Sequence, residues 1–103
     1  MESIGMQTRV IDTPDGNPAV FGEIQINREG AKTLLYYTHY DVIPPDPLDL
    51  WESDPFAAEI RNESVYARGA VDDKGLLVAR LSALQVLCDL SLEPICNIKF
   101  IVE

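Results

Sequence analysis

Several residue types are scarce in this sequence, and each scarcity excludes a class of site. The 103 residues contain one histidine and two cysteines. Cys88 and Cys96 have seven residues between them and form no C-x-x-C pair. A cysteine-based zinc knuckle is therefore excluded, and we expect both thiols to be small buried side chains.

Long apolar runs and targeting segments are also missing. No run approaches the roughly 20 residues that span a bilayer. The N-terminus has no basic start followed by an apolar core. These absences favour a cytoplasmic protein with no membrane partner.

Basic residues and the common nucleotide or nucleophile motifs are scarce or absent. Eight Lys and Arg against 17 Asp and Glu give a net charge of −9, which repels phosphate backbones and disfavours nucleic acid as a partner. The sequence has no G-x-S-x-G, G-x-G-x-x-G or P-loop, so a serine nucleophile or a nucleotide site has no support. The carboxylates either solvate the surface or converge on cations.

The remaining pattern predicts one α/β domain at most. Apolar residues make up 47% of the chain, which is enough for one modest core. The run at 32–38 is apolar on both faces and is typical of a central strand covered on both sides. An apolar helix with a narrow polar stripe is predicted at 75–90, packed against the sheet. Further strands are expected at 8–12, 19–27, 56–61, 65–68 and 95–102.

The only histidine stands just after the predicted strand at 32–38. Ligands of α/β sheets bind at the carboxyl ends of strands, so His39 and Asp41 are candidates for a site. Residues two apart on a strand point the same way, and a metal-binding histidine usually donates its other ring N–H to a carboxylate. Taken alone, the H-x-D pair is also compatible with a histidine and a turn aspartate without function.

Two adjacent carboxylates precede the predicted helix. Aspartate is a favoured N-cap, but only one residue can be the N-cap. Paired acids repel unless a cation lies nearby, and a divalent metal would supply it. Asp72 and Asp73 are therefore open to both interpretations, capping and metal ligation.

Read together, three ordered stretches are much more specific. They are Thr-His-Tyr-Asp-Val-Ile-Pro at 38–44, Trp-Glu-Ser-Asp-Pro-Phe at 51–56 and Ala-Arg-Gly-Ala-Val-Asp-Asp-Lys-Gly at 67–75. This order resembles the two-zinc metallopeptidase family of acetylornithine deacetylase, succinyl-diaminopimelate desuccinylase, aminoacylase and the carnosine-type dipeptidases. The proline-rich loop that precedes Trp51 looks most like the dipeptidase branch.

The resemblance implies a role for each candidate residue. His39 would bind one metal, Asp72 would bridge both metals, and Asp41 would support the catalytic base. The metals would be two zinc ions, with cobalt or manganese as alternatives. They would polarise an amide carbonyl of a small peptide or N-acyl amino acid and activate a water. The Asp72–Asp73 peptide is expected to be cis, and the family usually has glycine where Thr38 and Ala67 stand.

The resemblance also predicts that residues 1–103 are part of a larger catalytic domain, incomplete at both ends. The implied fold is a three-layer αβα domain with a mixed sheet, here without its lid domain. Glu103 matches the first glutamate of the family's Glu-Gly-x-Glu-Glu motif, whose last two glutamates supply the general base and a ligand. We therefore expect these residues alone to be inactive. The alternative is a non-catalytic α/β interaction module, degenerate from the family.

Overall fold

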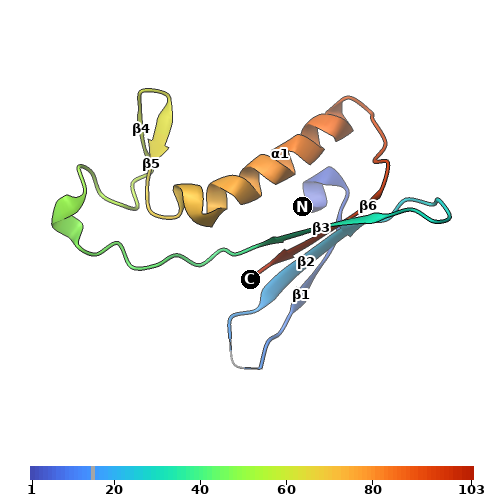
Figure 1. Cartoon of the computed structure of the whole chain (residues 1–103), viewed down its shortest axis with the longest axis horizontal. Coiled ribbons are helices and arrows are strands. Elements are labelled where there is room, and N and C mark those ends of the chain that lie inside the picture. Colours follow the sequence, from blue (N-terminus) through green and yellow to red (C-terminus); the bar gives the residue numbers. More distant parts are fainter. Residues whose placement is uncertain (15) are drawn as a thin grey trace.

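A four-stranded mixed sheet forms the centre of the computed structural model, which describes residues 1–14 and 16–103 (Figure 1). Across the sheet the order is β1 (Gln7–Ile11), β2 (Ala19–Ile24), β6 (Asn97–Val102) and β3 (Thr33–Thr38). β2 is antiparallel to both β1 and β6, whereas β3 and β6 are parallel. The strands lie close to their predicted ranges, and the sheet is mixed as expected.

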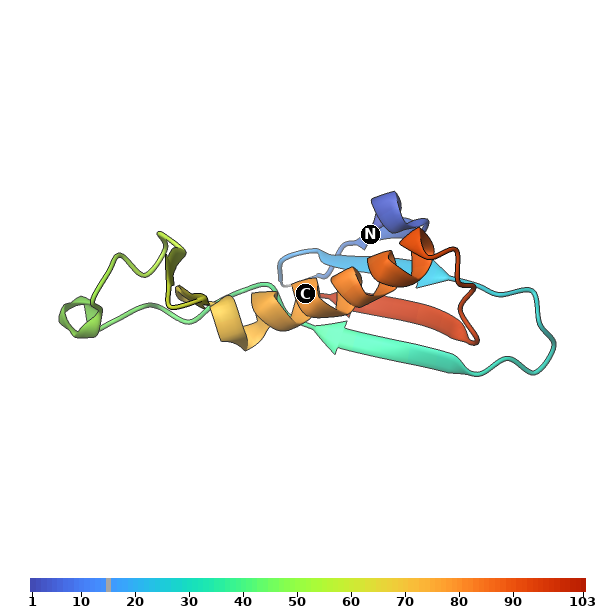
Figure 2. The same ribbon diagram turned by 90° about the horizontal axis from the view of Figure 1, so that it is seen from above.

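One face of this sheet is covered by α1 (Leu76–Asp89) and by the 3-10 helix η1 (Glu2–Ile4), as Figure 2 shows. Alternate residues of β6 point to this face, which is the period of two that a strand imposes. The core joins these strand residues to two leucines of α1 and to the N-terminal segment. Its buried members are Ile4, Met6, Leu77, Leu84, Ile98, Phe100 and Val102.

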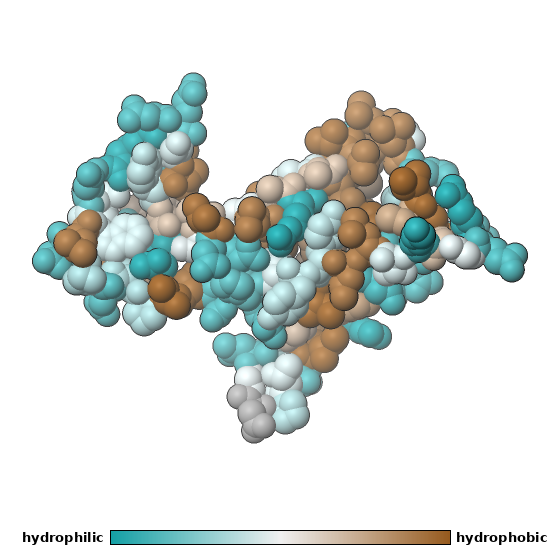
Figure 3. Space-filling view, in the orientation of Figure 1, coloured by the Kyte–Doolittle hydropathy of each residue, from teal (hydrophilic) through white to brown (hydrophobic). Residues whose placement is uncertain are grey.

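The helix packs less completely than its composition predicts. Leu77 and Leu84 are buried, but Val78, Val86 and Leu87 are exposed. Figure 3 shows apolar surface over the C-terminal part of α1. The prediction of close packing against the sheet is thus confirmed for one stripe of the helix and wrong for the rest.

The prediction that residues 32–38 form a central strand is wrong for the part of the chain that the structure describes. β3 is an edge strand and pairs only with β6. Leu35 and Tyr37 point away from α1 and are 54% and 57% exposed. An apolar strand shows that both its sides are suited to burial, but it does not show which other segments cover them.

A long proline-rich segment and a small hairpin project from the sheet (Figure 2). The hairpin consists of β4 (Glu59–Arg61) and β5 (Ser64–Tyr66), and η2 (Leu48–Leu50) lies in the proline-rich segment. Trp51 anchors this segment, since its Nε1 donates to Pro45 O at 2.7 Å. The radius of gyration is 16.7 Å, well above the roughly 13 Å of a compact domain of this length.

Two further expectations concern cysteines and membranes. Cys88 is exposed and Cys96 is half-buried, so the expected burial of both is not found. Cys88 lies near the C-terminal end of α1, and although its residue is exposed, its thiol donates to Ile4 O at 3.7 Å. No helix in the described ranges is long and apolar enough to cross a membrane.

The core assignment predicts a contrast between two phenylalanines. Phe100 is 0% exposed and its ring centroid lies 4.7 Å from that of Tyr36, so Phe100→Ala should lower the free energy of unfolding by about 3–5 kcal/mol. Phe56 is 63% exposed, so Phe56→Ala should change it by about 0.5 kcal/mol or less. Chemical denaturation followed by circular dichroism measures both, and equal losses would contradict this core.

Candidate metal centre

The parallel pairing of β3 with β6 creates the edge at which the candidate residues lie. In the register Thr38 stands opposite Val102, so both strands end together. The backbone hydrogen bonds between the two strands continue past the strand ends. Glu103 N donates to Thr38 O at 3.2 Å, and Tyr40 N donates to Glu103 O at 2.5 Å. The backbone on both sides of His39 is therefore held by hydrogen bonds to Glu103.

The second half of the site comes from η3 (Ala70–Gly75), a π-helical turn that leads into α1. Glycine is required just before this turn and at its last residue. Gly69 has φ +79°, and a Cβ there would lie 2.5 Å from Val42 Cγ1. A Cβ on Gly75 would lie 2.0 Å from Ala70 O. The Asp72–Asp73 peptide within this turn is cis, as the resemblance implied.

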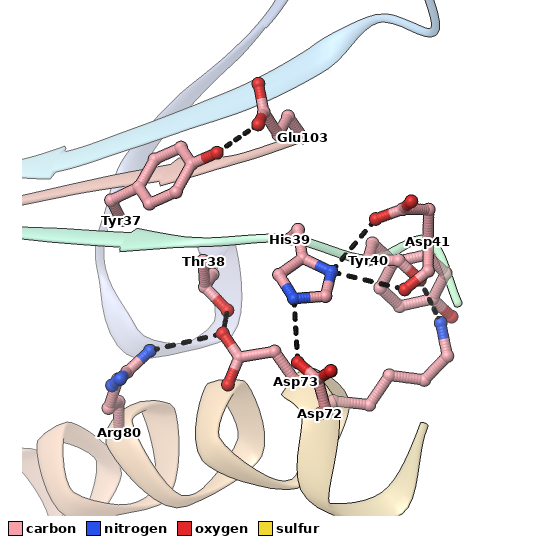
Figure 4. Close-up of polar contacts among 10 residues, drawn as sticks. Tyr37, Thr38, His39, Tyr40, Asp41, Asp72, Asp73, Arg80 and Glu103 are labelled. Atoms are coloured by element: carbon pink, nitrogen blue, oxygen red, sulfur yellow. Dashed lines mark hydrogen bonds and ion pairs between the residues drawn. The ribbon is translucent and has the colours of Figure 1, made fainter. Parts of the chain in front are cut away.

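His39 lies between two carboxylates (Figure 4). Its Nε2 is 2.9 Å from Asp72 Oδ1, and its Nδ1 is 2.9 Å from Asp41 Oδ1. The structure thus brings together all three residues that the sequence singled out. The His39 side chain is 34% exposed and both carboxylates are more exposed still, so the cluster is open to solvent.

These contacts change the acidity of the imidazole. The hydrogen bond with Asp72 and then that with Asp41 raise the pKa of His39 above its usual 6.5, and partial burial opposes them. Both ring nitrogens face acceptors, so the protonated ring, which donates from both, is favoured. A metal at Nε2 would take the place of that proton.

The donor set fits part of a metal site. Two atoms bound to one tetrahedral zinc at 2.0–2.2 Å lie roughly 3.3–3.6 Å apart, so His39 Nε2 and Asp72 Oδ1, which are 2.9 Å apart, would separate by about half an ångström to share one ion. Asp41 on the other ring nitrogen matches the carboxylate–histidine–metal arrangement. Within residues 1–14 and 16–103, however, no three His, Cys, Asp or Glu side chains are grouped to hold a metal. These residues can supply two ligands and one supporting carboxylate.

The two adjacent aspartates point in different directions. Asp72 reaches His39, whereas Asp73 is buried and accepts a hydrogen bond from the Thr38 hydroxyl. Arg80 Nη1 lies 3.6 Å from Asp73 Oδ2. Neither η3 nor α1 has a side-chain N-cap hydrogen bond, so the capping interpretation is wrong.

Sequence reasoning did not find the Thr38–Asp73–Arg80 group. A partial signal existed, because a second carboxylate that is not the N-cap needs a cation. Arg80 lies seven residues after Asp73, about two helical turns, which is compatible with that role. Nothing in the sequence identified Thr38 as the hydroxyl donor.

Two further contacts border the centre. Lys74 Nζ donates to Tyr40 O and lies 3.3 Å from the centroid of the Tyr40 ring, which ties η3 to the segment after His39. The Tyr37 hydroxyl donates to the Glu103 carboxylate, and this hydrogen bond raises the pKa of Tyr37.

His39 and Asp72 meet at the carboxyl edge of the sheet, where ligands of α/β proteins bind, and both side chains are of the types that bind zinc. The sequence model of Peptidase family M20/M25/M40 matches residues 35–103. The chain belongs to this family.

Known proteins agree with this assignment. Succinyl-diaminopimelate desuccinylase of Methylococcus capsulatus is 49% identical over 57 residues, which are 55% of this chain and 15% of that protein. A family M20 metallo-carboxypeptidase of Sulfolobus solfataricus superposes with a TM-score of 0.85 and 40% identity, and human carnosine dipeptidase 1 with 0.87 and 28%. Each of these two matches covers 99% of this chain and 23% of the solved one.

The fold is therefore that of an M20 metallopeptidase catalytic domain, in the part that the described residues form. The chain spans about a sixth to a quarter of the length of the relatives it matches.

The position of His39 predicts a measurable pKa. In the metal-free protein its pKa should exceed 6.5, because two carboxylates accept from its ring, and Asp72→Asn should lower it towards that value. A proton NMR titration of the imidazole measures both. Asp49→Asn, an exposed aspartate of η2, is the control and should change nothing. A pKa that Asp72→Asn leaves unaltered would contradict the geometry.

Proposed function

We propose that this chain supplies part of the two-zinc centre of a peptidase or amidohydrolase. The observation that carries the proposal is the position of His39, with Asp72 at Nε2 and Asp41 at Nδ1. His39 would bind one metal and Asp72 would bridge two. Zinc is the expected ion, with cobalt or manganese as alternatives, since imidazole and carboxylate suit all three.

Each residue has a distinct task. Asp41 accepts a hydrogen bond from the Nδ1–H group of His39, which leaves Nε2 free as a ligand and fixes the ring. By family resemblance Asp41 also supports the catalytic base, a glutamate that these residues do not contain. Zinc, when bound, polarises the amide carbonyl and lowers the pKa of a water molecule.

The substrate class we propose is a small peptide or an N-acyl amino acid. The support is that the relatives are named as a desuccinylase, a metallo-carboxypeptidase and a carnosine dipeptidase. All three act on an amide bond in a small molecule or at a chain end. The cytoplasmic location expected from the sequence stays a prediction.

We further propose that residues 1–103 are one part of a catalytic domain. Catalytic zinc uses about three protein ligands, and the described residues bring two to the centre. The remaining ligands and the general base come from other segments of the complete protein. A Gly-x-Glu-Glu sequence encoded after Glu103 would support this assignment, and a stop codon there would favour a non-catalytic interaction module.

The incomplete ligand set predicts the behaviour of residues 1–103 in isolation. They should bind zinc weakly and hydrolyse no dipeptide or N-acyl amino acid, because a ligand and the base are absent. Amino acid release measured with the purified chain and added zinc checks this. Zinc-dependent cleavage above the rate of the His39→Ala chain would contradict it.

In the complete protein, removal of a ligand and removal of its support should differ. His39→Ala and Asp72→Asn should lower zinc affinity by more than about 100-fold, which is the upper end for supporting residues. The Asp41→Asn protein should bind zinc more tightly than the His39→Ala and Asp72→Asn proteins do. Its kcat should be about 10–100-fold below that of the wild type. Metal content after dialysis and steady-state kinetics measure these effects.

Asp49→Asn is the matched control for the two carboxylate changes and should leave zinc content and kcat unchanged. If Asp72→Asn retained the wild-type zinc content, the proposed ligand set would be wrong.

A further inference from the structure

A buried polar cluster lies directly behind the two candidate ligands. Thr38 precedes His39 at the end of β3, and Asp73 follows Asp72 in η3. Thr38 is 1% exposed, and its hydroxyl donates to Asp73 Oδ2. Figure 4 shows this contact next to that of His39 with Asp72. The strand end and η3 are thus joined in the interior by Thr38 and Asp73, and at the solvent side by His39 with Asp72 and by Lys74 with Tyr40 O.

Arg80 of α1 completes the cluster. Its Nη1 lies 3.6 Å from Asp73 Oδ2 and is buried, with no hydrogen-bond partner among the described residues. The guanidinium also lies 5.9 Å from the centroid of the Tyr36 ring of β3. The Asp73 carboxylate is therefore held by a hydroxyl from the strand and by a cation from the helix.

The outer contact is too weak to fix its own geometry. His39 and Asp72 are open to solvent, where ion pairs contribute little and are screened by salt. The inner contact is buried, and a buried carboxylate that loses a donor is strongly unfavourable. The inner contact is therefore the buried polar link between the strand end and η3, whereas the contact of Lys74 with Tyr40 O is exposed.

We propose that Thr38 is a positioning residue of the metal centre. Through Asp73 its hydroxyl sets the separation between His39 Nε2 and Asp72 Oδ1. This inference rests on the proposed function, because it takes these two atoms as ligands. Metal sites tolerate only about 0.2 Å of change in ligand distances, so a small separation of β3 from η3 weakens binding.

Three forms of the complete protein test the role of the hydroxyl. Thr38→Val removes the hydroxyl but keeps the shape of the side chain, and Thr38→Ser keeps the hydroxyl. We expect zinc affinity, measured by competition with a chelating dye, to fall at least about tenfold in Thr38→Val. Thr38→Ser should restore it to near the wild-type value. The visible spectrum of bound cobalt should shift in Thr38→Val and return in Thr38→Ser.

A core variant separates positioning from general stability. Leu84 is buried in α1 and belongs to the apolar core, outside the polar cluster. Leu84→Ala should lower the melting temperature but leave zinc affinity and the cobalt spectrum as in the wild type. Thr38→Val with wild-type affinity and spectrum overturns the inference. Equal losses of affinity in Leu84→Ala and Thr38→Val also overturn it.

If Thr38→Val does not fold, Thr38→Ala takes its place, with the same expected loss and the same contradicting result. The experiment also distinguishes a failure of the proposed function from a failure of the positioning role of Thr38. Zinc affinity that His39→Ala leaves unchanged would refute the ligand assignment and this inference with it. Binding that depends on His39 but not on the Thr38 hydroxyl refutes the inference alone.

Discussion

The parallel pairing of β3 with β6 is the constraint on which the site depends. Parallel strands need a crossover connection, and here that crossover contains the proline-rich segment, the hairpin, η3 and α1. The strand ends and the beginning of the helical region therefore lie at one edge of the sheet. His39 follows one strand, Glu103 follows the other, and Asp72 lies in the turn before the helix. Three distant parts of the chain meet because of one backbone register.

Burial divides the polar residues at this edge into two groups. His39, Asp41 and Asp72 are open to solvent, where a metal and a substrate can reach them. Thr38 and Asp73 are buried, and Arg80 covers them from α1. Adjacent residues in the sequence, Thr38 with His39 and Asp72 with Asp73, thus belong to different groups. The exposed group can bind ligands, and the buried group can hold the exposed one in place.

Much of this arrangement could be predicted from the sequence. The strands and the helix lie close to the ranges predicted from the sequence, because turn residues and apolar runs delimit them. His39 and Asp72 were expected to converge, and the structure places them 2.9 Å apart. The direction of Asp73 was not predictable, because it depends on a hydroxyl 35 positions away in the chain. The family resemblance drew attention to Thr38 only as a replacement of glycine, whereas the structure shows it making a buried hydrogen bond.

The failures concern exposure, and they have one physical cause. Apolar patterning identifies surfaces suited to burial but not the segments that bury them. β3 and α1 both carry more apolar surface than the described residues cover, and the relatives are about four times as long as the chain. The half-covered sheet and the two-ligand centre therefore support the same proposal. Segments of the complete protein that cover Leu35 and Tyr37 would lie beside the edge where a third ligand is needed.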